Sequence, residues 1–151
     1  MISAKSCGIS FLPVVLVFST VGVTGCDLLF KPQLSDLKTC ETLNLQGFCQ
    51  DNLNSFQNKN QKLFVSANLR NASSNTSIKV DWKYLPNSGP LAGKEIPLTS
   101  KTTKPQGAND FVVASISSPS GGWQKGKYKV ILTLPESANS EPSIKEFTMT
   151  P

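Results

Sequence analysis

The chain has 151 residues, 38% of them hydrophobic and 17% charged, and its formal net charge at pH 7 is +5. This length fits one domain plus a targeting segment, and the composition excludes both a wholly disordered chain and a protein that crosses a membrane many times. The chain contains no histidine, so the commonest general base and most zinc and copper sites are ruled out, while its ten glycines and ten prolines favour a turn-rich β protein.

An export signal is the first element that the sequence predicts. Lys5 supplies a positive charge near the start, and residues 8–25 are strongly apolar and contain no charged side chain. A basic start, an apolar middle and small residues before a cleavage point are the three parts of a secretory signal peptide. Pro13 disfavours a stable membrane helix, and the segment is short for a span. The alternative is an uncleaved signal anchor that ends in a chance cysteine.

This apolar segment ends in the four residues Val23-Thr24-Gly25-Cys26. In this setting they resemble the lipobox of a bacterial lipoprotein precursor, which has an aliphatic residue first and a small residue before the cysteine. The resemblance implies that residues 1–25 are removed as a signal peptide and that Cys26 is the lipid attachment site, with a diacylglyceryl thioether and an acylated amino group. We therefore expect the protein in the bacterial cell envelope, facing the periplasm or the exterior and held at the membrane by acyl chains such as palmitate.

Residues 26–55 are predicted to form a tether. Ser35 is a suitable cap for a short helix in which Leu34, Leu37 and the Thr39–Cys40 pair fall near one face. Further along, residues 50–61 are rich in asparagine and glutamine, a composition typical of a spacer or a long polar loop. This shift in composition places the predicted domain boundary near residue 55.

Two cysteines of the tether, Cys40 and Cys49, are predicted to form a disulfide. Cys7 lies in the predicted signal peptide and Cys26 at its end, which leaves this pair in the exported part of the chain. Cysteines of exported proteins are commonly paired, and the short loop between these two makes a bridge plausible. A metal site is the weaker alternative, because two thiols alone do not complete a tetrahedral shell.

From Lys62 onward, apolar and polar residues alternate in short segments that end at turn residues. This period of two is the pattern of strands with one buried face. These segments are residues 63–70, 78–84, a weaker one at 95–99, and then 111–116, 128–134 and 144–149. Pro97 restricts the third of these to a sheet edge. With about seven short strands separated by turns, the sequence predicts an all-β fold, an antiparallel β-sandwich.

Two features of this region resemble the immunoglobulin-like superfold over residues 56–151. Trp82 lies on an alternating strand, where such domains carry a core tryptophan. The segment from Trp123 to Tyr128 resembles the corner before a late strand, in which a tyrosine hydroxyl bonds back to the upstream backbone, and Gly126 would permit the sharp turn. The disulfide that joins the two sheets of antibody domains is absent, so the resemblance is to the broader superfold. It implies a fold and says almost nothing about activity.

A candidate ligand contact lies in the same corner. Trp123 follows a pair of glycines, and Lys125, Lys127 and Lys129 alternate after it, so the lysines are predicted to share the outer face of one strand. These four residues could bind a carbohydrate or a polyanion. The alternative, which we favour, is that the aromatic residues pack in the fold and the lysines protect a solvated strand from aggregation.

Catalytic groups are not indicated by the sequence. Asp81, Glu95 and Asp110 are isolated from one another, and the serines have no histidine base. We therefore expect no enzymatic activity, no cofactor, no metal and no small-molecule substrate, and the scattered basic residues predict no nucleic-acid partner. The favoured function is a non-enzymatic structural or interaction module that binds another envelope protein through a sheet edge or its end loops.

Overall fold

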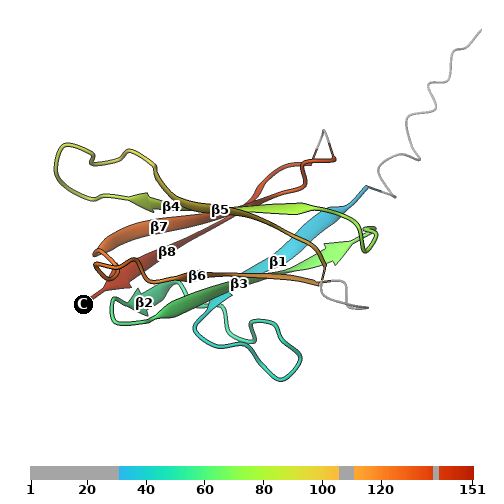
Figure 1. Ribbon diagram of the computed structural model, residues 1–151, viewed down its shortest axis with the longest axis horizontal. Helices are drawn as coiled ribbons and strands as arrows, with labels where there is room; N and C mark the ends of the chain where they lie inside the picture. Colours follow the sequence, from blue (N-terminus) through green and yellow to red (C-terminus); the bar gives the residue numbers. More distant parts are fainter. Residues whose placement is uncertain (1–30, 106–110, 138–139) are drawn as a thin grey trace, which may run out of the picture.

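A computed structural model describes residues 31–105, 111–137 and 140–151, in which every regular element is a β-strand. The predicted signal peptide and Cys26 lie outside the described residues. The strands are β1 (Gln33–Cys40), β2 (Ser55–Gln57), β3 (Lys62–Arg70), β4 (Ile78–Leu85), β5 (Ile96–Thr103), β6 (Phe111–Ser117), β7 (Gly126–Thr133) and β8 (Ser143–Thr150). They form two sheets packed face to face, which confirms the predicted all-β sandwich (Figure 1).

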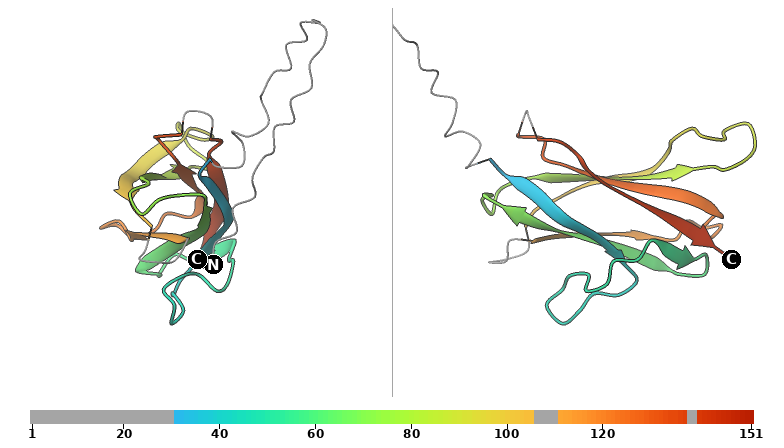
Figure 2. Two further views of the ribbon diagram at one scale, coloured as in Figure 1. Left: turned by 90° about the vertical axis from the view of Figure 1, so that its right-hand side faces the viewer. Right: turned by 180° about the vertical axis from the view of Figure 1, so that it is seen from behind.

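The smaller sheet has the strand order β1-β3-β6, and the larger has the order β2-β8-β7-β4-β5. All neighbours pair antiparallel except β2, which pairs parallel with β8. The described chain enters β1 at one end of the sandwich, and the C-terminus lies at the opposite end (Figure 2). The β4–β5 and β6–β7 connections lie at the same end of the sandwich as the C-terminus, as Figure 1 shows.

The core lies between the sheets and is built by the alternation that the sequence predicts. On β4, for example, Val80 and Trp82 are buried while Lys79 points to solvent. Phe147 of β8 is at the centre of an aromatic cluster, with its ring 6.1 Å from Trp82, 5.3 Å from Phe56 and 5.6 Å from Tyr128 between centroids. Such offset and edge-on pairs add to the free energy gained by burying the rings. The expected core position of Trp82 is confirmed.

The prediction of a short helix beginning at Ser35 is wrong, because this segment is the strand β1. β1 pairs with β3, and its register shifts between Ser35 and Lys38. The shift is a β-bulge, in which one extra residue changes the spacing of inward-facing side chains from two to three. Leu34 and Leu37 therefore both pack against the core. A spacing of three is also the spacing of one helix face, which explains the incorrect prediction.

The sandwich begins upstream of the boundary predicted near residue 55. β1 belongs to the smaller sheet, and β2, which lies in the segment predicted as a spacer, extends the larger sheet. Phe56 of β2 is buried and lies opposite Met149 of β8. Leu53 also packs against the core, and its N–H donates to the Thr39 carbonyl at 2.8 Å. The chain from Gln33 onward is therefore part of the fold instead of a free tether.

Candidate functional site

The predicted disulfide between Cys40 and Cys49 is confirmed, with the two sulfur atoms 2.04 Å apart and both residues buried. The Cys49 N–H donates to the Ser66 hydroxyl of β3 at 3.1 Å. Phe48 packs edge-on against Phe111 of β6, with 5.6 Å between ring centroids. The loop that the disulfide closes is therefore bound to two strands of the smaller sheet, next to its outer face. We call residues 41–48 the disulfide loop.

The tip of the disulfide loop presents a leucine to solvent. The Asn44 side-chain oxygen accepts hydrogen bonds from the N–H groups of Gln46 at 3.0 Å and Phe48 at 3.1 Å. Leu45, inside this bonded turn, is fully exposed. A rigid turn that holds an apolar side chain away from the fold loses little entropy when a partner covers that side chain. The sequence does not single out Leu45, because Leu43 lies two residues earlier in the same segment and only the fold exposes one of the two fully.

The predicted tyrosine corner is present. The Tyr128 hydroxyl donates to the Gln124 carbonyl at 2.7 Å. Burial, and then the neighbouring Tyr84, raise the pKa of Tyr128 to about 12, so its hydroxyl remains a donor. Gly126 has a φ of +149°, and a Cβ there would lie 2.9 Å from the Tyr84 ring. The position therefore favours glycine for two independent reasons.

Trp123 is buried, which corrects its assignment as an exposed ligand contact. Its side chain is 4% exposed, and its indole N–H donates to the Asn60 carbonyl at 2.6 Å. The ring also packs edge-on against Tyr128, with 5.5 Å between centroids. A sugar needs an open ring face for stacking, and the fold covers this ring. Trp123 thus fixes the corner to the segment before β3.

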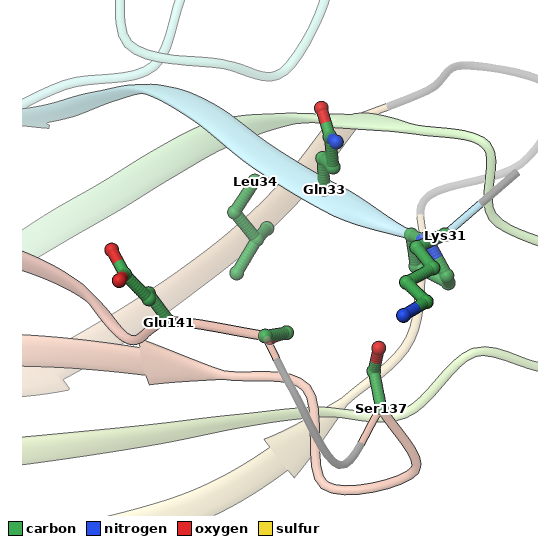
Figure 3. Close-up of a pocket in the computed structure, with 7 residues that line it drawn as sticks. Lys31, Gln33, Leu34, Ser137 and Glu141 are labelled. Atoms are coloured by element: carbon green, nitrogen blue, oxygen red, sulfur yellow. The ribbon is translucent and has the colours of Figure 1, made fainter. Parts of the chain in front are cut away.

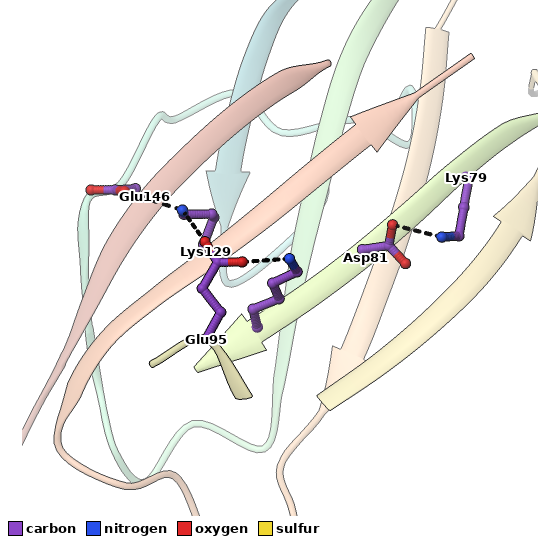
Figure 4. Close-up of polar contacts among 6 residues, drawn as sticks. Lys79, Asp81, Glu95, Lys129 and Glu146 are labelled. Atoms are coloured by element: carbon purple, nitrogen blue, oxygen red, sulfur yellow. Dashed lines mark hydrogen bonds and ion pairs between the residues drawn. The ribbon is translucent and has the colours of Figure 1, made fainter. Parts of the chain in front are cut away.

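The three candidate lysines do not form a uniform cationic strip. Lys125 precedes β7, and Lys127 is exposed. The Lys129 ammonium lies 2.6 Å from a Glu95 oxygen and 3.9 Å from a Glu146 oxygen (Figure 4). Its hydrogen bond with Glu95 raises the pKa of Lys129. Lys129 is therefore paired within the fold, and two of the predicted cationic contacts remain open to solvent.

Glu95 is the centre of a small ion-pair network that joins three segments. One of its oxygens accepts from Lys129 of β7, and the other accepts from Lys83 of β4 at 2.5 Å. These hydrogen bonds, first from Lys129 and then from Lys83, lower the pKa of Glu95 from 4.5 to about 2. A carboxylate that stays ionised at neutral pH is not a general acid. Glu95 instead fixes the end of the β4–β5 loop to the larger sheet.

Asp81 is likewise engaged in structure. Its carboxylate lies 3.0 Å from the Lys79 ammonium on the same strand. Burial raises the pKa of Asp81, but hydrogen bonds from Ser100 and Lys79 outweigh this effect and lower it. Asp110 lies outside the described residues. Within the described parts of the chain, no group of three or more possible metal-ligating side chains comes together, and no helix is long and apolar enough to cross a bilayer.

Among the surface hollows of the described residues, two lie at opposite ends of the sandwich. One, of about 630 Å³, lies between the β4–β5 and β6–β7 loops and is lined in part by Tyr84, Leu91 and Lys125. The other, of about 420 Å³, lies where the chain enters β1, and Lys31 and Ser137 point toward each other across it (Figure 3). The β1 hollow is lined mainly by polar side chains, which include Gln33 and Glu141 besides these two.

Comparisons with known proteins place the fold but not a family. No known family model matches the chain, and no curated protein matches it in sequence. Among solved structures the chain is similar to an immunoglobulin-like protein from Pseudomonas aeruginosa, with a TM-score of 0.55 and 9% identity over 80% of this chain and 97% of that one. At this identity the likeness shows the fold alone, and it confirms the immunoglobulin-like β-sandwich.

Enzymes also appear among the similar structures. A β-glucosidase from Listeria innocua in complex with gluconolactone matches 80% of this chain with a TM-score of 0.44 and 13% identity. The same enzyme in complex with glucose matches 80% of this chain with a TM-score of 0.43 and 10% identity. In both cases the matched part is only 16% of the glucosidase chain.

Proposed function

We propose that this chain is a lipid-anchored protein of the bacterial cell envelope whose immunoglobulin-like sandwich is a non-enzymatic module that binds another envelope protein. The Cys40–Cys49 disulfide carries this proposal. Disulfides persist in oxidising compartments outside the cytoplasm, which agrees with export by the signal at residues 1–25. The same bond holds the disulfide loop, whose exposed Leu45 is a preorganised contact for a partner.

The position of β1 determines how the module is presented. If Cys26 carries acyl chains, only residues 27–32 separate it from the first residue of β1. Six extended residues span at most roughly 20–22 Å. The anchor would therefore keep the sandwich close to the bilayer, where a partner in the same membrane meets it at a high effective concentration. A protein partner in the membrane plane is the kind of ligand that this arrangement favours.

The state of the ionisable side chains supports a non-enzymatic module. The Glu95 carboxylate is bound by two lysines, and Asp81 is bound by Lys79. The Tyr128 hydroxyl is bound to the backbone. Each of these groups stabilises the sandwich in a defined protonation state. These side chains are therefore engaged in holding the fold together, which favours a structural or binding role.

Capture of a partner from membranes tests the proposal. The full-length tagged protein is cross-linked in cells, extracted in detergent and purified with what it holds. We expect one envelope protein to be enriched, and we expect Leu45→Ser to reduce its recovery because the exposed apolar contact is lost. Leu91→Ser is the matched control, because Leu91 is also exposed, at 48%, but lies in the β4–β5 loop. Enrichment of polysaccharide without any protein would contradict the proposal.

A further inference from the structure

The two sheets have four edges, and three of them carry features that block pairing with another chain. β1 has a bulge at residues 35–38 that contains Asp36, and β2 is only three residues long. β5 contains Pro97 and Lys101 and has a register shift. Bulges, short length, prolines and charged residues are the devices by which proteins prevent sheets from joining edge to edge.

The fourth edge, β6, has none of these devices. Its seven residues, FVVASIS, include no charge, no proline and no glycine, and its pairing with β3 is regular over the whole strand. β-branched and aromatic residues favour an extended chain. Among the described strands, the outer edge of β6 is without a hydrogen-bonded neighbour.

The hydrogen bond between β3 and β6 at their shared end identifies the backbone groups that point outward. The Ser118 N–H donates to the Gln61 carbonyl at 2.8 Å, so Ser118 directs its backbone groups toward β3. Residues of an antiparallel strand alternate in this direction. Ile116, Ala114 and Val112 therefore also bond to β3. The residues with outward N–H and C=O groups are Phe111, Val113, Ser115 and Ser117.

We propose that β6 of a second copy of this chain pairs antiparallel with this edge, around a two-fold axis at Ala114. In this register Phe111 lies opposite Ser117 of the second copy, and Val113 lies opposite Ser115. Each outward N–H of β6 then lies opposite an outward C=O of the second copy, where the two can form a hydrogen bond. The two small sheets become one continuous six-stranded sheet.

The composition of β6 favours a second copy as the occupant. Like charges placed opposite each other on paired strands are destabilising, and β6 has no charge to repel itself. Ala114, at the axis, has the smallest side chain of the strand and allows close approach. A two-fold interface gives a closed dimer, in which both β6 edges are paired and no further copy can add to form a fibre.

The proposed pairing agrees with attachment to one membrane but does not depend on it. Because the two β6 strands run in opposite directions, the two chains enter their sandwiches at opposite ends of the pair. A two-fold axis along the membrane normal brings both starting points, at Gln33, to the same height above the bilayer. The inference thus goes beyond the proposed function, since either could hold without the other.

Cross-linking of the full-length protein in cells tests the pairing. Two Ala114→Cys chains would place their cysteines directly across the axis, within reach of a disulfide. Under a mild oxidant we expect a dimer that reductant removes. Ser100→Cys, on the protected edge β5, should give no more dimer than the unsubstituted chain, which controls for Cys7 and Cys26. Absence of a dimer with Ala114→Cys, or equal dimer with Ser100→Cys, would overturn the proposal.

A second experiment avoids any new cysteine. Two differently tagged full-length copies are expressed together, and we expect them to purify together from detergent extract. Ser115→Pro should abolish this co-purification, because it removes an outward N–H without removing a bond to β3. Ser115→Ala keeps the N–H and should leave co-purification unchanged. If the copies do not purify together, or if Ser115→Pro has no effect, the pairing through β6 is wrong.

Discussion

Removal of the Cys40–Cys49 disulfide should lower the free energy of unfolding by about 2.6 kcal/mol, the chain-entropy value for a loop of this size. The bond closes a sequence separation of 9 residues, so it restricts the unfolded chain only locally. In the folded state the disulfide loop keeps other contacts, because Phe48 still packs on Phe111 and the turn at Asn44 is bonded within itself. Most of the loss should therefore come from the greater freedom of the unfolded chain.

Urea unfolding monitored by tryptophan fluorescence measures this loss. Trp82 and Trp123 are both buried, so unfolding exposes both indole rings. The comparison is between the oxidised protein, the same protein in reductant, and the double variant Cys40→Ala/Cys49→Ala. We expect the last two to agree closely and to unfold with a slightly larger dependence on urea, since the unlinked chain exposes more surface.

The control for this experiment is Leu45→Ser in the same loop. Leu45 is fully exposed, so its replacement should leave the free energy of unfolding unchanged. A loss below about 1 kcal/mol in the double variant would contradict a mainly entropic stabilisation, because it is less than half of the chain-entropy value. Complete loss of the folded state would show that the bond does more than restrict the unfolded chain.

Three further predictions concern the corner and the ion-pair network. Tyr128→Phe should cost about 1 kcal/mol in urea unfolding, because it removes one part-buried hydrogen bond, and an unchanged midpoint would count against the corner. Gly126→Ala should cost about 2 kcal/mol through backbone strain and the close approach to Tyr84, whereas Lys127→Ala, next to it and exposed, should be neutral. The folded-state pKa of Glu95 is about 2, below its ordinary value of 4.5. The contribution of its carboxylate to the free energy of unfolding is therefore complete above pH 4.5 and is lost as the pH falls toward 2. The difference in urea midpoint between wild type and Glu95→Gln should therefore shrink over that range, and a constant difference would contradict the assignment.

The strands that sequence alone predicts are those with one regularly alternating buried face. β4 and β7 are examples, since Trp82 and Val130 face the core while their neighbours along each strand do not. β1 is not predicted in this way, because its bulge makes the spacing of the inward-facing residues Leu34 and Leu37 three instead of two. β2 is not predicted either, because three residues are too few for a pattern and its partner β8 is more than 90 residues away in sequence.

At the candidate site, too, contacts between residues near in sequence can be predicted, and contacts between distant residues cannot. The tyrosine corner is predictable, because the Tyr128 hydroxyl bonds to a carbonyl four residues upstream. The burial of Trp123 is not, because the Asn60 carbonyl that accepts its N–H is 63 residues away. The pairing of Lys129 also depends on a distant residue, Glu95, which is 34 residues upstream. Sequence spacing gives the face of a side chain but not its partner on another strand.

Fatty-acid labelling at Cys26 shows whether this chain is a lipid-anchored envelope protein. The full-length chain and its Cys26→Ser variant are expressed in bacteria with labelled palmitate and compared by gel electrophoresis. We expect label on the wild-type protein and no label on the variant, which should keep residues 1–25 and migrate as a larger precursor. An unlabelled wild-type protein, or equal labelling of both chains, would contradict lipid attachment at Cys26.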